Sequence, residues 1–342
     1  MAKTRKLTRI PSEETPLPPL RSVPSASPQP VDVSILIVTW NSARFIDRCL
    51  QALPAACDGF TYEVIVHDNA SADDTLQRID PDANVILRGS QNDGFAAGTN
   101  HAFAASQGRY VFLLNPDCEL APGALALLRA FLDGHAEAAG AVPLLVGNDG
   151  ELQREFQLRR LPTLGTLATE LLAIGRLFPK NRATAHYRYR DVDLTAPAPI
   201  EQPAAAALLL RRETFEDLGR FDEQFSPAWF EDVDFCRRLA AQQKSIWVVP
   251  AARAKHYGGA SLEHLSFDQF TDIWYGNMWR YARKWLGPGE RETLRWLVIF
   301  GMTLRLGAAA IGIAHPEVGR RRAFAAYAGV LKKAFHRWST TA

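Results

Sequence analysis

The segment from Val33 to Val66, VSILIVTWNSARFIDRCLQALPAACDGFTYEVIV, decides the fold. It opens with a β-branched run, Val33–Thr39, and closes with a second one, 62–66. Between these runs, apolar residues from Phe45 to Leu53 recur at helical spacing. Strands with such continuous apolar character are typical of a sheet that is covered on both faces. The segment therefore predicts a β-α-β unit with parallel strands and a right-handed crossover.

The pattern continues beyond this unit. We expect strands at 85–87, 110–114, 141–145, 204–210 and 245–249, and helices at 95–105 and 122–133. The basic stretch from Arg154 to about Pro199 is expected to be an irregular, mobile surface segment. The fold class is α/β, with a mostly parallel central sheet flanked by helices.

Composition excludes several classes of protein. The chain has 342 residues and a net charge of +2, which gives no general reason to expect a nucleic acid partner. Its four cysteines are dispersed and form no CxxC motif, which argues against a zinc site or a disulfide framework and fits a reducing, cytosolic compartment. Residues 1–30 are basic and rich in Pro and Ser, so we expect a disordered tail without a secretory signal.

Polar residues follow the first two strands at the points where they end. Thr39, Trp40 and Asn41 follow the first strand, and Asp68 and Asn69 follow the second. Ligands of open α/β sheets bind beyond the carboxyl ends of the strands, so these groups are expected to line one pocket. Asp68 can accept a hydrogen bond from a base imide or a ribose hydroxyl. The alternative is that Asp68 and Asn69 only cap the next helix.

A glycine-containing turn leads into the predicted helix at 95–105. Gly94, Phe95 and Asn100 belong to this turn and the start of the helix. Small residues let a ligand approach the backbone, and a helix N-terminus favours an anion. GxxxG spacing is also common where a helix packs closely, so the signal is weak.

The strand at 110–114 is followed by Asn115, Pro116 and Asp117. Asp117 stands at a carboxyl end and can supply oxygen ligands to Mg²⁺ or Mn²⁺, and Asn115 can add a weaker oxygen or contact a nucleotide. A metal at this point would neutralise charge on a diphosphate leaving group. The alternative is a simple turn before the next helix.

Three acids open a helix near Trp229. Carboxylates in a first helical turn are stabilised by the macrodipole, so some acid is expected there for structural reasons. Asp234 can pair with Arg237 or Arg238 along the helix, which makes it the structural member. Asp232 is then free to act as a general base, with Glu231 as the alternative.

Taken together, the motifs VSILIVTWNS, VIVHDNASADDT, NDGFAAGTN, GRYVFLLNPDCELAPGAL, ALLLRRETFEDLGRFDEQF, FEDVDFCRRL and VVPAARAKHYGG resemble the family 2 inverting glycosyltransferases of the GT-A fold, especially their rhamnosyltransferase-like branch. The resemblance covers roughly residues 31–261. It implies a domain at 31–265, with a nucleotide-sugar half at 31–150 and an acceptor and catalytic half at 151–265. Residues 266–342 then form a helical C-terminal extension.

The resemblance also implies roles for single residues. Asp117 matches the last acid of the metal motif, His256 a further metal ligand, Asp68 the nucleotide-binding aspartate and Asp232 the catalytic base. Asn115 replaces the acid that is usual at the first position of the metal motif. Alanines at 204–206 remove side-chain hydrogen bonds where the family has acceptor contacts.

The implied reaction transfers a sugar from a nucleoside diphosphate sugar, with dTDP-rhamnose as the expected donor. The acceptor is a saccharide or a polyprenyl-linked saccharide, in the synthesis of cell-surface polysaccharide. The apolar, arginine-flanked stretch at 291–322 is either a buried helix or a helix lying in the interface at the cytoplasmic face of the inner membrane. The sequence does not predict the oligomeric state.

Two rival functions belong to other classes. A Rossmann-type oxidoreductase shares the β-α-β pattern, but no GxGxxG follows the first strand. A catalytically silent sugar-nucleotide-binding or scaffold protein would not need Asp117, Asp232 and His256.

Overall fold

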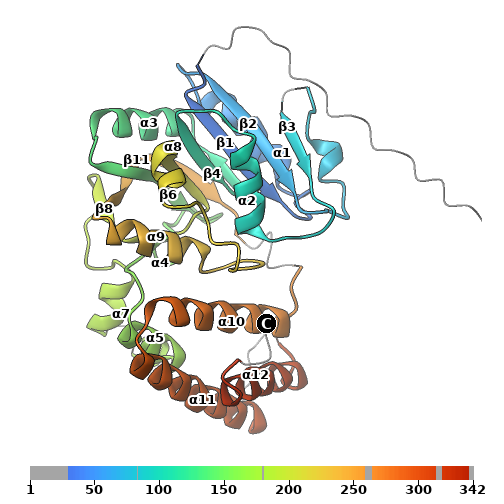
Figure 1. Cartoon of the computed structure of the whole chain (residues 1–342), viewed down its shortest axis with the longest axis vertical. Coiled ribbons are helices and arrows are strands. Elements are labelled where there is room, and N and C mark those ends of the chain that lie inside the picture. The colour runs from blue at the N-terminus through green and yellow to red at the C-terminus, as the bar shows by residue number, and fades with distance from the viewer. Residues whose placement is uncertain (1–29, 83, 179–180, 259–263, 313–317, 339–342) are drawn as a thin grey trace, which may run out of the picture.

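The computed structural model describes residues 30–82, 84–178, 181–258, 264–312 and 318–338. The predicted disordered tail at 1–30 lies almost wholly outside the described residues. Two layers are evident in Figure 1: a sheet domain, and below it a group of helices formed mostly by the C-terminal part of the chain.

The sheet is mixed and mostly parallel in its first half. Its strand order is β3-β2-β1-β4-β10-β6-β11-β5, and β8 pairs with β11. Neighbours β3, β2, β1 and β4 run parallel, as do β6 and β11, while β10 and β5 are antiparallel to their neighbours. The strands are β1 (Val33–Thr39), β2 (Tyr62–Asp68), β3 (Val85–Arg88), β4 (Tyr110–Leu114), β5 (Cys118–Leu120), β6 (Ala138–Val146), β8 (Ala198–Ile200), β10 (Ala207–Arg211) and β11 (Ser245–His256).

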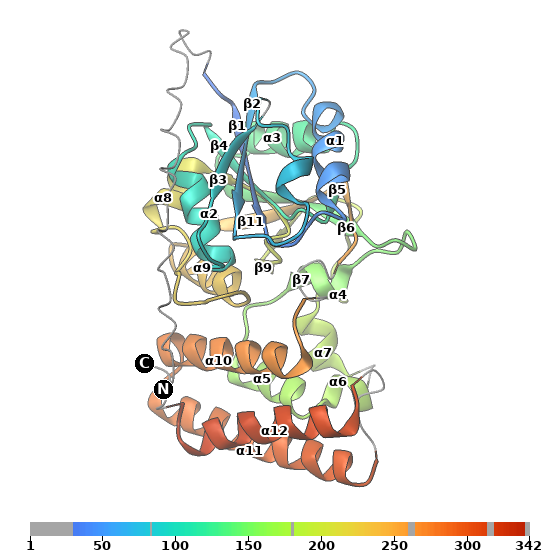
Figure 2. The same cartoon turned by 90° about the vertical axis from the view of Figure 1, so that its right-hand side faces the viewer.

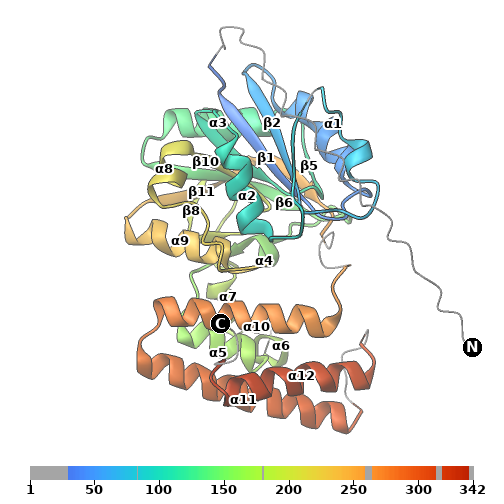
Figure 3. The ribbon, with the colours of Figure 1, turned by 45° about the vertical axis from the view of Figure 1, so that its right-hand side comes forward.

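Helices cover both faces of this sheet, as the apolar strands predicted. Alternate residues of β1 enter different cores: Ile35 and Ile37 pack with α1 (Ile46–Ala56) and α3 (Ala124–Gly134), whereas Leu36 packs with α2 (Phe95–Ala104). The second core also takes in residues of α8 (Arg212–Asp217) and α9 (Glu231–Ala241). Figure 3 shows α1 and α2 on opposite sides of the strands.

The segment expected to be irregular is largely ordered into short elements. It contains α4 (Arg154–Gln157), β7 (Leu158–Arg159), α5 (Leu164–Leu171), α6 (Ile174–Leu177) and α7 (Arg182–Tyr187), and β7 pairs with β9 (Gln202–Pro203). Its arginines are not simply solvated, because Arg188 forms ion pairs with Glu155 and Glu170. These pairings join residues far apart in sequence, so local composition did not reveal them. One short 3-10 helix, Leu76–Arg78, follows β2.

The C-terminal helices form a separate bundle. Helices α10 (Phe267–Trp285), α11 (Pro288–Ala310) and α12 (Arg320–Phe335) lie close together, with α5 beside them (Figure 2). Their shared core contains Met278, Val298 and Val330, and it continues into Phe230 and Val233 at the start of α9. The bundle therefore packs directly against the segment that carries the three clustered acids.

Candidate active site

Asp117 and His256 are brought together by strand pairing. Asp117 stands between β4 and β5, and β5 pairs antiparallel with the end of β11, with Cys118 opposite His256. The His256 Nε2 atom lies 3.6 Å from Asp117 Oδ1, and each residue is only 4% exposed. Sequence analysis ended the strand before this histidine at Val249. Strand β11 instead runs on to His256 through an irregularity between Val248 and Arg253, which aims the histidine at the metal motif.

A glutamine that the sequence analysis missed fixes the state of this histidine. Gln153 Nε2 donates to the His256 carbonyl at 3.0 Å, so Gln153 Oε1 faces the ring and lies 2.7 Å from Nδ1. Because an amide oxygen only accepts, Nδ1 carries the proton and Nε2 keeps its lone pair. Burial also lowers the His256 pKa, against the opposing effect of Asp117. No local motif marks Gln153, which follows the turn at 147–150.

The two groups that face each other, Nε2 of His256 and Oδ1 of Asp117, are therefore both acceptors. Their donor set, one imidazole and one carboxylate in a buried position, suits a divalent cation such as Mn²⁺ or Mg²⁺. Cys118 lies within the same group of three potential ligands. Burial raises its thiol pKa well above the usual value, and Sγ donates to the Ala206 carbonyl, so it does not serve as a thiolate ligand.

The three acids of α9 differ in environment. Asp234 is fully buried and accepts from Arg238, Lys284 and Trp285, which confirms its predicted pairing with Arg238. Glu231 is 6% exposed, and its Oε2 has no hydrogen-bond partner among the described residues. Only Asp232 is partly exposed.

The protonation of the neighbouring pair follows from this burial. Burial, with the Asp232 charge beside it, raises the Glu231 pKa well above its usual value, and burial also raises the Asp232 pKa. Hydrogen bonds to the carboxylate of Asp232, from the Val233 N–H at 2.8 Å and from Gln202 Nε2 at 3.3 Å, favour its charged form. These hydrogen bonds therefore favour the charged form on Asp232 over Glu231, whose Oε2 has no such donor among the described residues, and Asp232 is the better placed base.

Two consecutive alanines connect the base to the metal motif. The Ala205 backbone forms a hydrogen bond with Asp232, and the carbonyl of Ala206 accepts from the Asn115 N–H at 2.8 Å. The sequence analysis expected lost acceptor contacts at these alanines, because their side chains cannot form hydrogen bonds. Their backbone instead links the two halves of the site. The side-chain amide of Asn115 is partly exposed beside Asp117.

The ends of β1 and β2 lie side by side, with Thr39 in register with Asp68. Both oxygens of Asp68 accept hydrogen bonds within the chain: Oδ1 from Thr39 Oγ1 at 2.8 Å and from Ser71, and Oδ2 from the Ser71 N–H. Asn41 joins the same loop, since its Oδ1 accepts from the Ala72 N–H. Asp68 is 1% exposed and thus organises this corner as a cap does. The neighbouring Trp40 ring is partly exposed and packs edge-on to His264.

The predicted glycine turn has a structural role. A Cβ on Gly94 would lie 2.6 Å from the Pro227 carbonyl oxygen, and the same carbonyl accepts from the Phe95 N–H at 2.8 Å. The close approach that requires glycine is therefore made by the chain itself. Asn69 donates to the Gly94 carbonyl, and Asn100 binds the backbone of residue 221. These contacts engage the amide groups of both asparagines, and their expected roles in nucleotide binding stay predictions.

Comparison with known proteins found a family match. Residues 34–192 match the family model described as Glycosyl transferase family 2. This segment is a family 2 glycosyltransferase domain. With this domain the chain is a hexosyltransferase, and family 2 enzymes generally use a divalent metal.

Two characterised relatives of this glycosyltransferase carry related names. The N-acetylglucosaminyl-diphospho-decaprenol L-rhamnosyltransferase of Mycobacterium tuberculosis is 26% identical over 295 residues, which cover 79% of this chain and 90% of that protein. Rhamnosyltransferase WbbL of Escherichia coli is 24% identical over 262 residues, which cover 74% and 93%. The enzyme is thus a rhamnosyltransferase-like member of family 2.

A solved structure supports the fold alone. The crystal structure of GalNAc-T7 with UDP, GalNAc and Mn²⁺ superposes with a TM-score of 0.56 at 14% identity. The match covers 90% of this chain and 56% of that one, so the chain spans little more than half of that structure. The predicted GT-A fold is confirmed.

Proposed function

We propose that this glycosyltransferase moves rhamnose from dTDP-rhamnose to a saccharide carried on a polyprenyl diphosphate, at the cytoplasmic face of a membrane, in cell-surface polysaccharide synthesis. The names of both relatives support rhamnose as the transferred sugar, and the name of the Mycobacterium tuberculosis relative supports a saccharide on a polyprenyl diphosphate as the acceptor. The observation that carries the proposal is the convergence of Asp117, His256 and Asp232 through the Ala205–Ala206 backbone.

In this proposal Asp232 takes the proton of the acceptor hydroxyl. The acceptor oxygen forms a bond to the anomeric carbon, the bond from that carbon to the diphosphate oxygen breaks on the opposite side, and the configuration inverts. Gln202 and the Val233 N–H hold the carboxylate at the start of α9. Burial raises the pKa of Glu231 beside it, which disfavours a second negative charge in the site.

Asp117 and His256 would hold Mg²⁺ or Mn²⁺, which supplies charge neutralisation for the departing diphosphate. Asn115 stands beside them with a partly exposed amide. In the donor half, 31–150, Trp40 offers a partly exposed ring to a base, and Asp68 organises the loop around it. The acceptor then enters from the half at 151–265.

The test is a transfer assay with a panel of dTDP, UDP and GDP sugars and a polyprenyl-diphosphate-linked saccharide. Loss of a positioned general base costs about 10²–10⁴-fold in rate, so Asp232→Asn should lower kcat by that factor while Glu231→Gln stays within about tenfold. Exhaustive EDTA treatment should abolish transfer, and Mn²⁺ should restore it. Near-normal turnover by a folded Asp232→Asn protein would contradict the assignment of Asp232 as the base. Transfer from a different sugar nucleotide, and not from dTDP-rhamnose, would contradict the proposed donor.

A further inference from the structure

Helix α11 presents a long exposed apolar face. Trp296, Phe300 and Leu304 are 54%, 56% and 53% exposed, and Ile311, which directly follows the helix, is 76% exposed. At 100° per residue these positions fall within about 80° of one another, along about 22 Å of the helix. The opposite face, which includes Leu294 and Val298, is buried in the bundle. Large apolar side chains clustered in this way mark a surface that contacts a partner.

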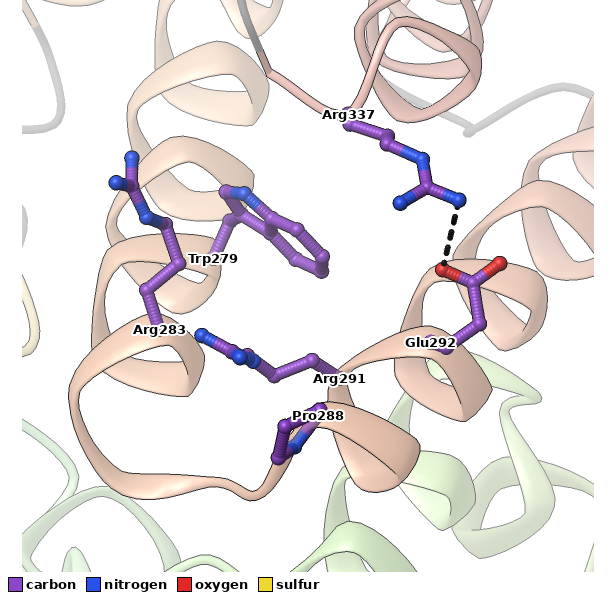
Figure 4. A pocket seen from close by; sticks show the side chains of 6 residues that line it. All are labelled: Trp279, Arg283, Pro288, Arg291, Glu292 and Arg337. Carbon is purple, nitrogen blue, oxygen red and sulfur yellow. Dashed lines mark ion pairs between the residues drawn. The ribbon is translucent and has the colours of Figure 1, made fainter.

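Arginines also cluster near the N-terminal end of α11, and by the same spacing Arg291 lies about 140–180° from the four apolar positions, on the side of the helix turned to the bundle. Arg283, Arg291 and Arg337 line a cavity of about 240 Å³ together with Trp279, Pro288 and Glu292. Figure 4 shows that these side chains come from α10, from the start of α11 and from the residues after α12, with Arg337 turned towards Glu292. Glu292 pairs with Arg337 and Arg295, whereas Arg283 and Arg291 form no ion pair within the described part of the chain.

Arginines also stand at the other end. Arg320, Arg321 and Arg322 are exposed in the first turn of α12, which begins near the end of α11, since Arg320 donates to the Ala310 carbonyl. Cations in a first turn oppose the helix macrodipole. In the described residues no acidic side chain pairs with them. Their placement is unfavourable for the isolated helix and is relieved by an anionic partner.

The charges indicate which partner covers the face. If two copies of the chain packed α11 against α11, in either direction, arginine clusters of the two copies would come near one another at the ends of the contact, because one cluster lies near each end of the helix. By length and composition alone α11 could cross a membrane, but 39% of its apolar window is buried inside the protein. Its Arg305 donates to the Leu171 carbonyl of α5 at 2.6 Å, which ties the helix to the bundle. A helix held in this way can lie along a bilayer but cannot cross it without breaking these contacts.

We propose that α11 docks on a bilayer containing anionic phospholipid, with its axis along the membrane plane. Trp296, Phe300 and Leu304 enter the boundary between headgroups and acyl chains, and the arginines at both ends bind lipid phosphates. The evidence for docking is this surface and does not depend on the proposed function. The link to a lipid-linked acceptor does rest on the proposed function, which it deepens by naming the surface through which the enzyme reaches that acceptor.

The same bundle holds the catalytic segment. Asn277 of α10 donates to the carbonyls of Ala228, at 2.7 Å, and Trp229, at 3.2 Å, just before the base-bearing helix. Docking through α11 therefore sets the height of the catalytic site above the membrane, because α10 connects the two.

Vesicle flotation of the full-length chain tests the proposal. Phosphatidylcholine vesicles with phosphatidylglycerol should carry the protein, and those without it should carry far less. Trp296→Ser/Phe300→Ser should lower the partition coefficient at least tenfold, whereas the exposed control pair Val85→Ser/Leu127→Ser should leave it unchanged. Each of Arg291→Gln and Arg321→Gln should lower it about fivefold, and the exposed controls Arg88→Gln and Arg253→Gln should not.

Equal flotation of the wild type and the Trp296→Ser/Phe300→Ser variant would overturn the proposal, and so would equal binding to vesicles with and without phosphatidylglycerol. A concentration-dependent dimer that the same variant dissolves, seen by light scattering without vesicles, would assign the face to a second copy instead. A transfer assay with a water-soluble acceptor separates docking from catalysis. The Trp296→Ser/Phe300→Ser variant should transfer sugar to this acceptor as the wild type does. If the wild type itself transfers no sugar, this result would count against the proposed function and not against docking.

Discussion

Gln153 is expected to control metal affinity although it does not touch the metal position. Gln153→Leu removes the acceptor of the His256 Nδ1 proton and leaves a buried donor unsatisfied. It also removes the amide that holds the His256 carbonyl. The imidazole then loses its fixed orientation, and Nε2 no longer has to face Asp117.

Loss of such an outer hydrogen-bond partner typically costs about 10–100-fold in metal affinity, equivalent to about 1.4–2.8 kcal/mol. We therefore expect Gln153→Leu to raise the Mn²⁺ dissociation constant by that factor, measured by electron paramagnetic resonance titration of free Mn²⁺. Gln153→Glu keeps an acceptor for Nδ1–H and should recover most of the affinity. The neighbouring Leu152→Ala is the matched control, because this side chain is 41% exposed.

Two results would refute this reasoning. One is a Gln153→Leu protein that binds Mn²⁺ within twofold of the wild type. The other is a Gln153→Glu protein that binds as weakly as Gln153→Leu, since an acceptor would then make no difference. Circular dichroism on each variant separates a local effect on His256 from a general loss of the fold.

Three further predictions concern the acids and the loop beside them. The raised Glu231 pKa means that the folded state keeps a proton that the unfolded chain releases, so the free energy of unfolding should fall as pH rises from the ordinary glutamate pKa towards the raised one. Glu231→Gln should remove this pH dependence. The variant should unfold at a higher urea concentration than the wild type at about pH 8, with little difference at about pH 4. Asp234→Leu should lower the free energy of unfolding by about 1–3 kcal/mol, because it removes the fully buried acceptor that Arg238, Lys284 and Trp285 share, while Asp193→Asn on the surface should change little in the same urea titration. Gly94→Ala should lower both the melting temperature and kcat, since its Cβ would lie 2.6 Å from the Pro227 oxygen; a variant with wild-type values would show that this loop yields freely.

Much of the sheet could be predicted from local pattern. The runs at Val33–Thr39 and 110–114 are strands because β-branched and apolar residues there have two buried faces to fill, and the structure confirms both. Asp234 was assigned to its helix from spacing alone, and the Arg238 contact at 2.9 Å confirms this. Such inferences succeed because each depends on residues close together in the chain.

Other features could not be predicted from the sequence, because they depend on residues far apart in the chain. The segment after Arg154 forms short helices and pairs β7 with β9, although its composition indicated an irregular surface. The glycine turn at Gly94 predicts a close approach to the backbone, and the structure shows that Pro227, far along the chain, makes one. In both cases the contacting residue lies far away in the sequence, so the pattern of neighbouring residues could not predict the contact.

The sequence alone determined which groups can do chemistry here: an acid after β4, acids at the start of α9 and a histidine after a buried strand. Only the tertiary structure decided how they act. Pairing of β11 with β5 turned His256 towards Asp117, and Gln153, 103 residues away, fixed its proton. Burial raises the pKa of both Glu231 and Asp232, because desolvation depends on everything packed around a carboxylate and not on its neighbours in sequence. The hydrogen bonds from Val233 and Gln202 then favour the charged form of Asp232.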